Sequence, residues 1–251
     1  MGKVDLDFKP SVPVFDACIT VGRRYDRYIR VDNVADTLAT MDRAGVQRAL
    51  AYTPHALDFD SVEGNSYLME MIKGQPRLVP QFAVNPSFDD LPLMAKSMKQ
   101  HGVRSLRIAP KFQRYPFREW VLGPFFDWLE ANRTPVWVAA EEIDPSEFHA
   151  TVSGRPGLRF VMSQVHFMHE TWAVPLLMSL PNVSIEVSRM LQPNSFNKLI
   201  DAIGAERVMF GSRFPDSAMA PQLYYLHRSG LSQSQLQAVC AGNLGRLLGK
   251  G

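Results

Sequence analysis

The segment Ile203–Pro215, IGAERVMFGSRFP, contains the last of eight strand-like runs along the chain. Within it, Arg207–Ser212 is largely apolar, and the charged side chain of Arg213 follows directly. A short apolar run between polar boundaries predicts a buried strand. Polar residues that follow such a strand become candidates for a functional site.

The seven other strand-like runs precede this segment, and each is followed by a helix-like stretch. Their starts lie roughly 22–35 residues apart, about what one strand–helix unit requires. They are Val14–Thr20, Ala49–Thr53, Leu78–Val84, Ser105–Ala109, Pro135–Ala140, Leu158–Gln164 and Val183–Ser188. Eight such units predict a single-domain (β/α)8 TIM barrel over residues 1–251, an α/β fold with a parallel sheet. An open doubly wound sheet is less consistent with the chain, which has no Gly-rich phosphate loop.

Helix signals lie between these runs. Asp32 or Asn33 can cap a helix whose apolar residues recur at helical spacing as far as residue 44, and Gly45 suits its end. The closing segment Leu231–Gly249 has a similar apolar stripe. We interpret these stripes as core.

Composition excludes several classes of protein. The 251 residues include 27 basic and 25 acidic side chains, a net charge of +2, which argues against nucleic acid as a partner. No apolar stretch approaches the ~18 residues that suggest a membrane span, and the first residues lack a signal core. Two cysteines, Cys18 and Cys240, are too few for a disulfide framework. We therefore expect a cytoplasmic protein with reduced thiols and no membrane partner.

Several tracts resemble the amidohydrolase-related proteins of the metal-dependent hydrolase superfamily. Ile203–Pro215 is similar to their eighth-strand signature, IGxxRhhFGSDxP, where h is apolar, and Val14–Gly22, VFDACITVG, is similar to their opening hDxHhHhG. Gly102–Pro110, Pro181–Ser188 and Asn243–Gly249 resemble their fourth strand, seventh strand and closing NxxRLhG. The resemblance covers essentially the whole chain.

This resemblance implies a (β/α)8 barrel with a mononuclear zinc-type site, used for hydrolysis or for decarboxylation of carboxylic acids. The family's metal ligands, however, are replaced in this chain. Their positions fall on Cys18, Thr20, Ala139, Gln164 and Arg213, with His166 two residues beyond Gln164. Catalytic zinc needs about three strong N, O or S ligands, and a guanidinium repels a dication. We therefore predict no metal and no other cofactor, although a site built from His55, His166 and Glu141 or Glu186 stays open.

Function in such a barrel lies at the carboxyl ends of the strands. We assign four candidate catalytic residues there: His166, His55, Glu141 and Cys18. The histidines suit acid–base chemistry, Glu141 could be a base, and Cys18 a nucleophile. Each also has a structural alternative: a satisfied buried histidine, a salt-bridged glutamate or an inert buried thiol.

Four residues are candidates for substrate binding: Arg213, Arg107, Gln164 and Glu186. Arginine at a strand end suits a carboxylate or phosphate. The alternative for Arg213 is an internal ion pair with Glu141 or Glu186, and for Arg189 we favour such a pair. Our hypothesis is an enzyme that acts on a small, anionic molecule without the usual metal. The alternatives are a pseudoenzyme that binds a ligand or protein partner at the same mouth and a barrel plugged by its own side chains. A homodimer is one assembly that the sequence allows.

Overall fold

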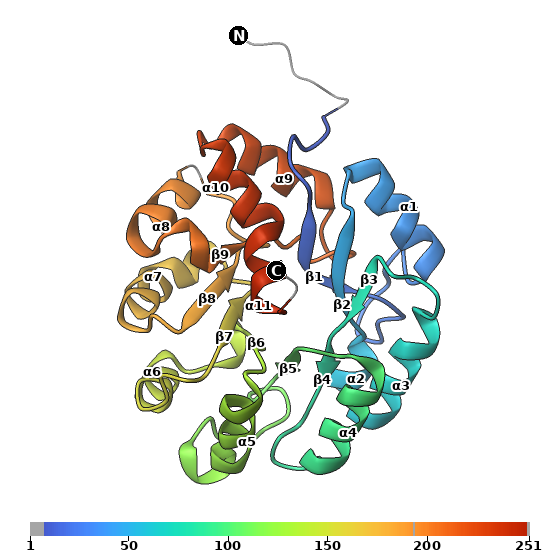
Figure 1. The fold of residues 1–251 in the computed structure, drawn as a ribbon, viewed down its shortest axis with the longest axis vertical. Coiled ribbons are helices and arrows are strands. Elements are labelled where there is room, and N and C mark those ends of the chain that lie inside the picture. The colour runs from blue at the N-terminus through green and yellow to red at the C-terminus, as the bar shows by residue number, and fades with distance from the viewer. Residues whose placement is uncertain (1–7, 193, 250–251) are drawn as a thin grey trace.

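Parallel strands form a ring at the centre of the structure, and helices surround it (Figure 1). The computed structural model describes residues 8–192 and 194–249. The strands are β1 (Phe15–Thr20), β2 (Arg48–Tyr52), β3 (Leu78–Pro80), β4 (Phe82–Ala83), β5 (Leu106–Ile108), β6 (Val136–Ala139), β7 (Phe160–Ser163), β8 (Val183–Glu186) and β9 (Val208–Met209). All eight predicted strands are present, because β3 and β4 together form the third.

The ring consists of two hydrogen-bonded sheets, β1-β2-β3 and β4-β5-β6-β7-β8-β9. At Gln81 the third strand changes partner: the Gln81 amide donates to Ala51 of β2, and the Phe82 amide donates to Ser105 before β5. The ring closes between β1 and the residues that follow β9, where the Ala17 amide donates to the Phe210 carbonyl at 2.9 Å. These contacts confirm the predicted (β/α)8 barrel.

The helices follow the strands in the expected alternation. They are α1 (Val34–Ala44), α2 (Pro54–Asp58), α3 (Ser61–Met71), α4 (Leu91–His101), α5 (Glu119–Asn132), α6 (Pro145–Val152), α7 (Glu170–Ser179), α8 (Ser195–Ile203), α9 (Met219–Arg228), α10 (Gln233–Gln237) and α11 (Asn243–Leu247). Short 3-10 turns cover Ala140–Glu142, Phe167–His169 and Ala205–Arg207, and a π-helical turn covers Ala238–Gly242. Arg207 therefore lies in a 3-10 turn, whereas we predicted it as the first residue of the last strand.

The predicted ends of the first helix are confirmed. The Asn33 side chain accepts a hydrogen bond from the Asp36 amide, which caps α1. Gly45 follows the last turn with a left-handed backbone, φ 73°, a conformation that glycine adopts without steric cost.

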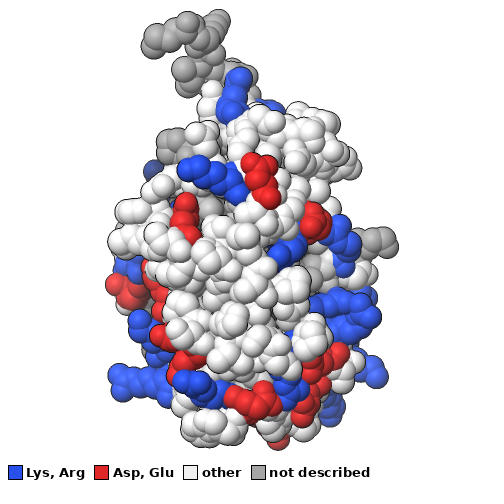
Figure 2. Space-filling model, turned by 90° about the vertical axis from the view of Figure 1, so that its left-hand side faces the viewer, with Lys and Arg blue, Asp and Glu red and all other residues white. Residues whose placement is uncertain are grey.

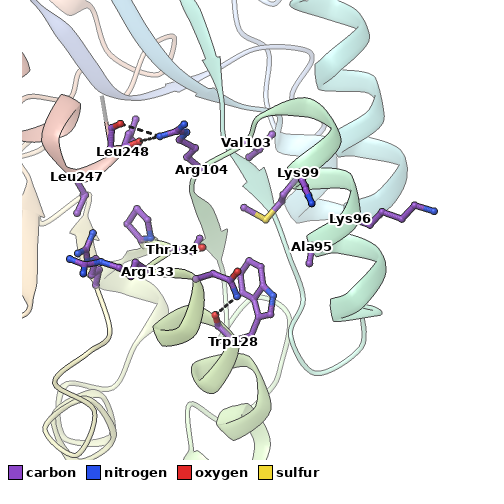
Figure 3. Close-up of a pocket in the computed structure, with 15 residues that line it drawn as sticks. Ala95, Lys96, Lys99, Val103, Arg104, Trp128, Arg133, Thr134, Leu247 and Leu248 are labelled. Carbon is purple, nitrogen blue, oxygen red and sulfur yellow. Dashed lines mark hydrogen bonds between the residues drawn. The ribbon is translucent and has the colours of Figure 1, made fainter. Parts of the chain in front are cut away.

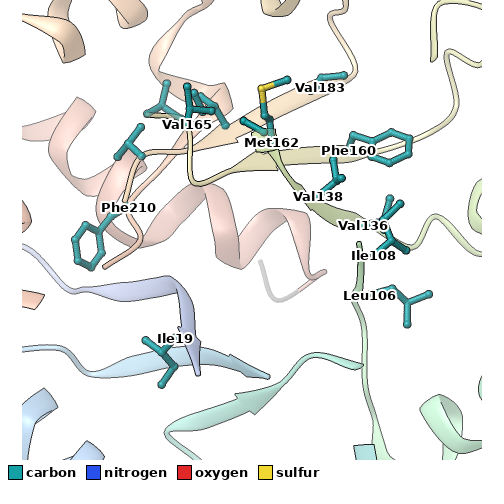
Figure 4. Packing of buried hydrophobic residues seen from close by; sticks show 14 of the residues in the cluster. Ile19, Leu106, Ile108, Val136, Val138, Phe160, Met162, Val165, Val183 and Phe210 are labelled. Carbon is teal, nitrogen blue, oxygen red and sulfur yellow. The ribbon is translucent and has the colours of Figure 1, made fainter. Parts of the chain in front are cut away.

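Alternation along the strands separates two apolar layers. On β6, Val136 and Val138 pack toward the helices with Leu106, Ile108 and Phe160 of the adjacent strands (Figure 4). Trp137 points to the opposite side of the same strand and belongs to a second cluster inside the ring. This inner cluster contains Phe15, Ala17, Leu50, Trp137, Val161 and Met209.

Helix α11 closes one end of the ring. It lies over the barrel centre in Figure 1, and its Leu244, together with Leu248, packs against the inner cluster. The inner cluster and α11 form an apolar floor, so open space for a ligand inside the ring can exist only at the carboxyl ends of the strands.

Figure 2 shows the face formed by α6, α7 and α8, where uncharged side chains occupy the centre and charged ones gather toward the edges. Met178 of α7 is 61% exposed. The homodimer stays a prediction.

Within residues 8–192 and 194–249, no helix has the length and apolarity needed to span a membrane. The amino-terminal residues 1–7, in which we expect no export signal, lie outside the described part of the chain.

Truncation of the floor should destabilise the barrel. Leu244 is 1% exposed, and a buried Leu→Ala change typically costs about 2–5 kcal/mol through lost burial and a residual cavity. We expect Leu244→Ala to lower the free energy of unfolding by that amount in urea titrations. Leu93→Ala is the matched control, because Leu93 of α4 is 53% exposed; equal losses for the two variants would contradict the role of α11 as a floor.

Candidate functional site

A cavity of about 580 Å³ opens at the carboxyl ends of the strands, opposite the floor. We call it the mouth. Its lining combines charged and aromatic side chains from the loops that follow β1, β2, β5, β6, β7 and β9. Among them are Arg24, Tyr25, Arg27, Tyr52, Asp58, Phe59, Arg107, Phe112, Glu141, Gln164, Arg213 and Asp216.

Arg107 of β5 occupies the centre of the ring beneath the mouth. Its Nε donates to Gln81 Oε1 at 3.0 Å, one Nη donates to Ser163 Oγ at 3.3 Å, and the other lies 3.6 Å from Cys18 Sγ. The guanidinium carbon lies 4.1 Å from the centroid of the Tyr52 ring, a cation–π contact. Although it lines the mouth, the residue is only 2% exposed. Among the residues that the structure describes, no direct hydrogen-bond partner of this cation is a carboxylate.

Two carboxyl groups are buried in the same region. Burial raises the pKa of Glu186, while hydrogen bonds from Ser188 and the charge of Arg107 offset part of the rise. Burial also raises the pKa of Asp16 to about 7, although its carboxyl accepts hydrogen bonds from the amides of Cys18 at 3.0 Å and Ser212 at 2.9 Å. Asp16 thus links β1 to the segment after β9. Both groups favour the neutral form more than an exposed carboxylate does.

Arg213 and Gln164, which stand where the resemblance places metal ligands, line the mouth. Both have left-handed backbones, with φ 58° for Arg213 and 56° for Gln164. Such a conformation is uncommon for residues other than glycine, and it persists where surrounding contacts impose it. One such contact is a hydrogen bond of 2.9 Å from the Arg213 amide to the Cys18 carbonyl.

The charged groups around Arg213 form what we call the rim cluster: Arg24, Asp26, Arg27, Arg213 and Asp216. Asp216 faces three guanidinium groups, at 3.3 Å from Arg24, 3.5 Å from Arg213 and 3.9 Å from Arg27. Asp26 pairs with Arg24 and Arg27, and these hydrogen bonds lower its pKa. Three permanent cations thus share two carboxylates. Within the described residues, the buried Nε of Arg213 has no hydrogen-bond partner.

The ion pair with Glu141 or Glu186 that we gave as the alternative for Arg213 does not form within the described residues. Arg213 instead pairs with a different carboxylate, Asp216, three residues later in the chain. Glu141 instead pairs with Arg189 at 2.6 Å, the ion pair that we favoured for Arg189. Partial burial alone would raise the pKa of Glu141, but this ion pair outweighs it and lowers the pKa.

The candidate histidines lie outside the residues that line the mouth. His55 contacts the rings of Tyr25 and Phe59, and its Nδ1 lies 3.3 Å from the Tyr25 hydroxyl. His166 stacks near Phe167, and its backbone amide donates to the ring of His169. Their catalytic roles stay predictions.

Cys18 lies beneath the mouth and is 1% exposed. Burial and the nearby charge of Glu186 raise the pKa of its thiol, and this outweighs the opposing effects of Arg107 and Arg213. The thiol form is therefore favoured, whereas a nucleophile requires the thiolate. The structure thus gives Cys18 the environment of a buried structural cysteine.

Sequence reasoning missed several groups that shape the site. Gln81 and Ser163 hold Arg107, Asp16 joins the barrel seam, and Asp58 lines the mouth. A signal for Gln81 existed, because it is a polar residue in an otherwise apolar strand run. Asp58 had no such signal, since it lies beyond the strand end in α2.

Comparison with known proteins identifies the family. The family model of the amidohydrolases matches residues 20–250, which is most of the chain. This chain belongs to the amidohydrolase family. No curated protein matches the sequence.

Solved structures support the same fold for this amidohydrolase-family chain. It is 15% identical to 5-carboxyvanillate decarboxylase from Sphingomonas paucimobilis, with a TM-score of 0.72, and 12% identical to 2,6-dihydroxybenzoate decarboxylase in complex with 2,6-dihydroxybenzoate, with a TM-score of 0.78. It is 17% identical to an amidohydrolase from Burkholderia multivorans with bound zinc, with a TM-score of 0.72. Each comparison covers 95% of this chain and 99% of the other. At such identities the likeness shows the fold alone.

The residues at the mouth of this amidohydrolase-family chain do not fit a divalent metal. No group of three or more His, Cys, Asp or Glu side chains that could hold an ion occurs within residues 8–192 and 194–249. The positions implied by the resemblance carry an amide, a methyl group and a permanent cation in Gln164, Ala139 and Arg213. The Cys18 sulfur lies against the guanidinium of Arg107, and a second cation there would be repelled.

The pKa of Asp16 predicts a dependence of stability on pH. Its native value of about 7 lies above the ordinary value of 3.8, so between these pH values the native state binds more protons and the free energy of unfolding falls as pH rises. Asp16→Asn removes this exchangeable proton. In urea unfolding between pH 4 and 7, we expect the free energy of unfolding of the wild type to fall with rising pH more steeply than that of the variant. The difference in slope should reach up to about 1.4 kcal/mol per pH unit. Parallel profiles would contradict the buried neutral carboxyl.

The donor set also predicts metal content. Protein purified from medium that contains zinc and manganese should hold well below one equivalent of either metal, and a chelator should leave its melting temperature unchanged. Elemental analysis and thermal unfolding with and without chelator measure both quantities. One equivalent of tightly held metal would show that the side chains rearrange to form a site.

Proposed function

We propose that this amidohydrolase-family protein binds a small organic acid at the mouth and uses the Arg107 guanidinium, in place of a metal, as the positive centre of the barrel. The observation that carries the proposal is the cage around Arg107. Its direct partners are an amide oxygen, a hydroxyl and a sulfur, none of which carries a full negative charge when the thiol is protonated. The buried carboxyl of Glu186 lies within reach of the Arg107 charge, but burial raises its pKa and favours its neutral form, so part of the positive potential is left for a ligand to offset.

The full lining of the mouth holds five carboxyl groups and four guanidiniums, but within the rim cluster the charges favour an anionic ligand. The cluster's three guanidinium groups exceed its two carboxylates by one charge. Arg213 is the residue best placed to receive a carboxylate, because its Nε is buried without a hydrogen-bond partner in the described part of the chain. A guanidinium offers two parallel N–H groups to a carboxylate, which gives both affinity and orientation.

Aromatic side chains narrow the proposed ligand to an acid with a flat apolar body. Tyr25, Tyr52, Phe59 and Phe112 all line the mouth, and such walls favour aromatic rings through stacking and edge contacts. The compounds named for the structural neighbours are of this kind, since one is a decarboxylase complexed with 2,6-dihydroxybenzoate. Aromatic carboxylic acids are therefore the first compounds to test.

A second candidate function, hydrolysis or decarboxylation of that acid, is supported by two carboxyl groups on the mouth. Burial raises the pKa of Asp58, which favours a proton donor, whereas Arg189 lowers the pKa of Glu141, which favours the ionised form. A donor and an acceptor on one cavity suit proton transfer. The alternative is a pseudoenzyme that binds the acid and leaves it unchanged.

Thermal unfolding across a panel of aromatic acids, amines and neutral sugars tests the binding proposal. A ligand at about 100 times its Kd stabilises the native state by ~2.7 kcal/mol, which for a chain of this length raises the melting temperature by roughly 5–10 °C. We expect acids alone to produce the shift. Arg213→Ala should abolish it, and Arg213→Lys should keep part of it, because an ammonium lacks the planar fork.

Arg43→Ala is the control for this series, because Arg43 is an exposed arginine of α1 remote from the mouth. Equal shifts in wild type and Arg213→Ala would contradict the assigned role of Arg213. Mass spectrometry of the acids that bind, after incubation with metal-free protein, separates turnover from binding. A product whose formation stops in Asp58→Asn supports the enzyme, and unchanged acid supports the pseudoenzyme.

A further inference from the structure

A second hollow, of about 730 Å³, lies at the opposite end of the barrel from the mouth (Figure 3). It lies between α4, α5 and the end of α11, and we call it the basal hollow. Arg104, Pro135 and Arg159, which line it, each come just before a strand begins. The hollow is thus built at the amino ends of β5, β6 and β7, where the proposed function uses no residue.

The basal hollow is lined by cations without compensating acids. Lys96, Lys99, Arg104, Arg133 and Arg159 line it, and no Asp or Glu does. None of these five side chains takes part in a salt bridge within residues 8–192 and 194–249. A concave surface with one sign of charge concentrates counter-ions.

Helix ends supply too little negative charge to explain this concentration of cations. Helices α4 and α5 both end at the hollow, near Lys99 and Arg133. Each carboxyl end contributes about half an elementary negative charge. Two such ends offset about one of the five positive charges, so most of the charge remains uncompensated.

One of the arginines is held in place by hydrogen bonds, and a second is partly buried against the wall of the hollow. Arg104 Nη1 donates to the carbonyls of Leu248 at 3.2 Å and Gly249 at 3.1 Å. Arg159 is partly buried, and its pKa is lowered by burial and by the charge of Arg133. An anion between these guanidinium groups would relieve their repulsion.

Trp128 adds an aromatic surface to the same wall. Its indole belongs to α5, lines the hollow and is partly exposed. The Asn132 side chain, one helical turn later, donates a hydrogen bond of 2.8 Å to the backbone carbonyl of Trp128. Cations that surround a space of this volume, with one partly exposed indole, suit a ligand with several negative charges and a flat ring.

We propose that the basal hollow binds a polyphosphate, with a nucleoside triphosphate as the best-fitting form. Lys99, Arg104, Arg133 and Arg159 receive the phosphate chain, and Trp128 stacks on the base. Lys96 also lines the hollow; its side chain extends outward in Figure 3 and adds to the positive potential there. The site is independent of the acid proposed for the mouth, since the two lie at opposite ends of the barrel.

Isothermal titration calorimetry of the full-length protein at ~150 mM salt tests the proposal, with ATP, inorganic triphosphate and citrate as probes. We expect ATP and inorganic triphosphate to bind. Citrate should bind much more weakly, because it carries fewer negative charges than the two phosphates and leaves some of the cations unpaired. The double variant Lys99→Gln/Arg133→Asn should weaken both phosphates roughly tenfold or more, since hydrogen bonds to charged groups are lost. Asparagine suits position 133, where the backbone is left-handed.

Three further variants separate the alternatives. Lys198→Gln removes one charge from the exposed surface of α8, outside the hollow, and should leave binding unchanged, which controls for net charge alone. Arg213→Ala should also leave it unchanged, which separates this site from the mouth. Trp128→Leu should weaken ATP and spare inorganic triphosphate.

Several results would overturn the proposal. One is that neither phosphate binds at millimolar concentration to protein with a wild-type melting temperature. Others are binding by the double variant as tight as that of the wild type, equal losses in Lys198→Gln and the double variant, and citrate binding as tight as that of triphosphate. Equal loss of ATP and triphosphate in Trp128→Leu would overturn the stacking arrangement, provided the melting temperature is kept.

Discussion

A permanent cation at the centre of the ring is the constraint on which the upper half of the barrel depends. A guanidinium cannot lose its proton in a protein, so the fold must provide acceptors or aromatic faces for Arg107 instead. It does so with Gln81, Ser163 and Cys18 from three other strands, and with the ring of Tyr52. The same requirement accounts for the polar side chains that lie above the apolar inner cluster.

This charge also decides what the mouth can do. It occupies the space beside Cys18, where the family resemblance places a metal ligand, and it partly offsets the cost of keeping Glu186 buried. One solved amidohydrolase of similar fold contains bound zinc. In the function proposed for this chain, the positive centre is a guanidinium of the chain itself, which keeps its charge across the pH range of the folded protein.

The fold could be predicted from the sequence because strand spacing and helix caps are local features. The first helix begins and ends where Asn33 and Gly45 predict, whereas the break at Gln81 and the register shift of β1 between Asp16 and Ile19 were not predicted. The location of Arg213 and Gln164 at one mouth followed from the same alternation. An ion pair of Arg189 was expected and is formed with Glu141, but the partner of Arg213 could not be predicted, because it depends on the direction of side chains at the mouth. Arg213 pairs with Asp216, three residues away in the chain.

The position of α11 bears on how the chain is made. The ribosome adds Leu244 and Leu248 after every strand of the ring, so a nascent barrel leaves the exit tunnel with the inner faces of Phe15, Leu50 and Trp137 still uncovered. Domains fold as units during synthesis, and exposed apolar surface at this stage invites aggregation. Formation of α11 therefore completes the barrel. A polypeptide released before Asn243 keeps the apolar inner cluster exposed at one end of the ring, and chaperones and proteases recognise such exposed apolar surface.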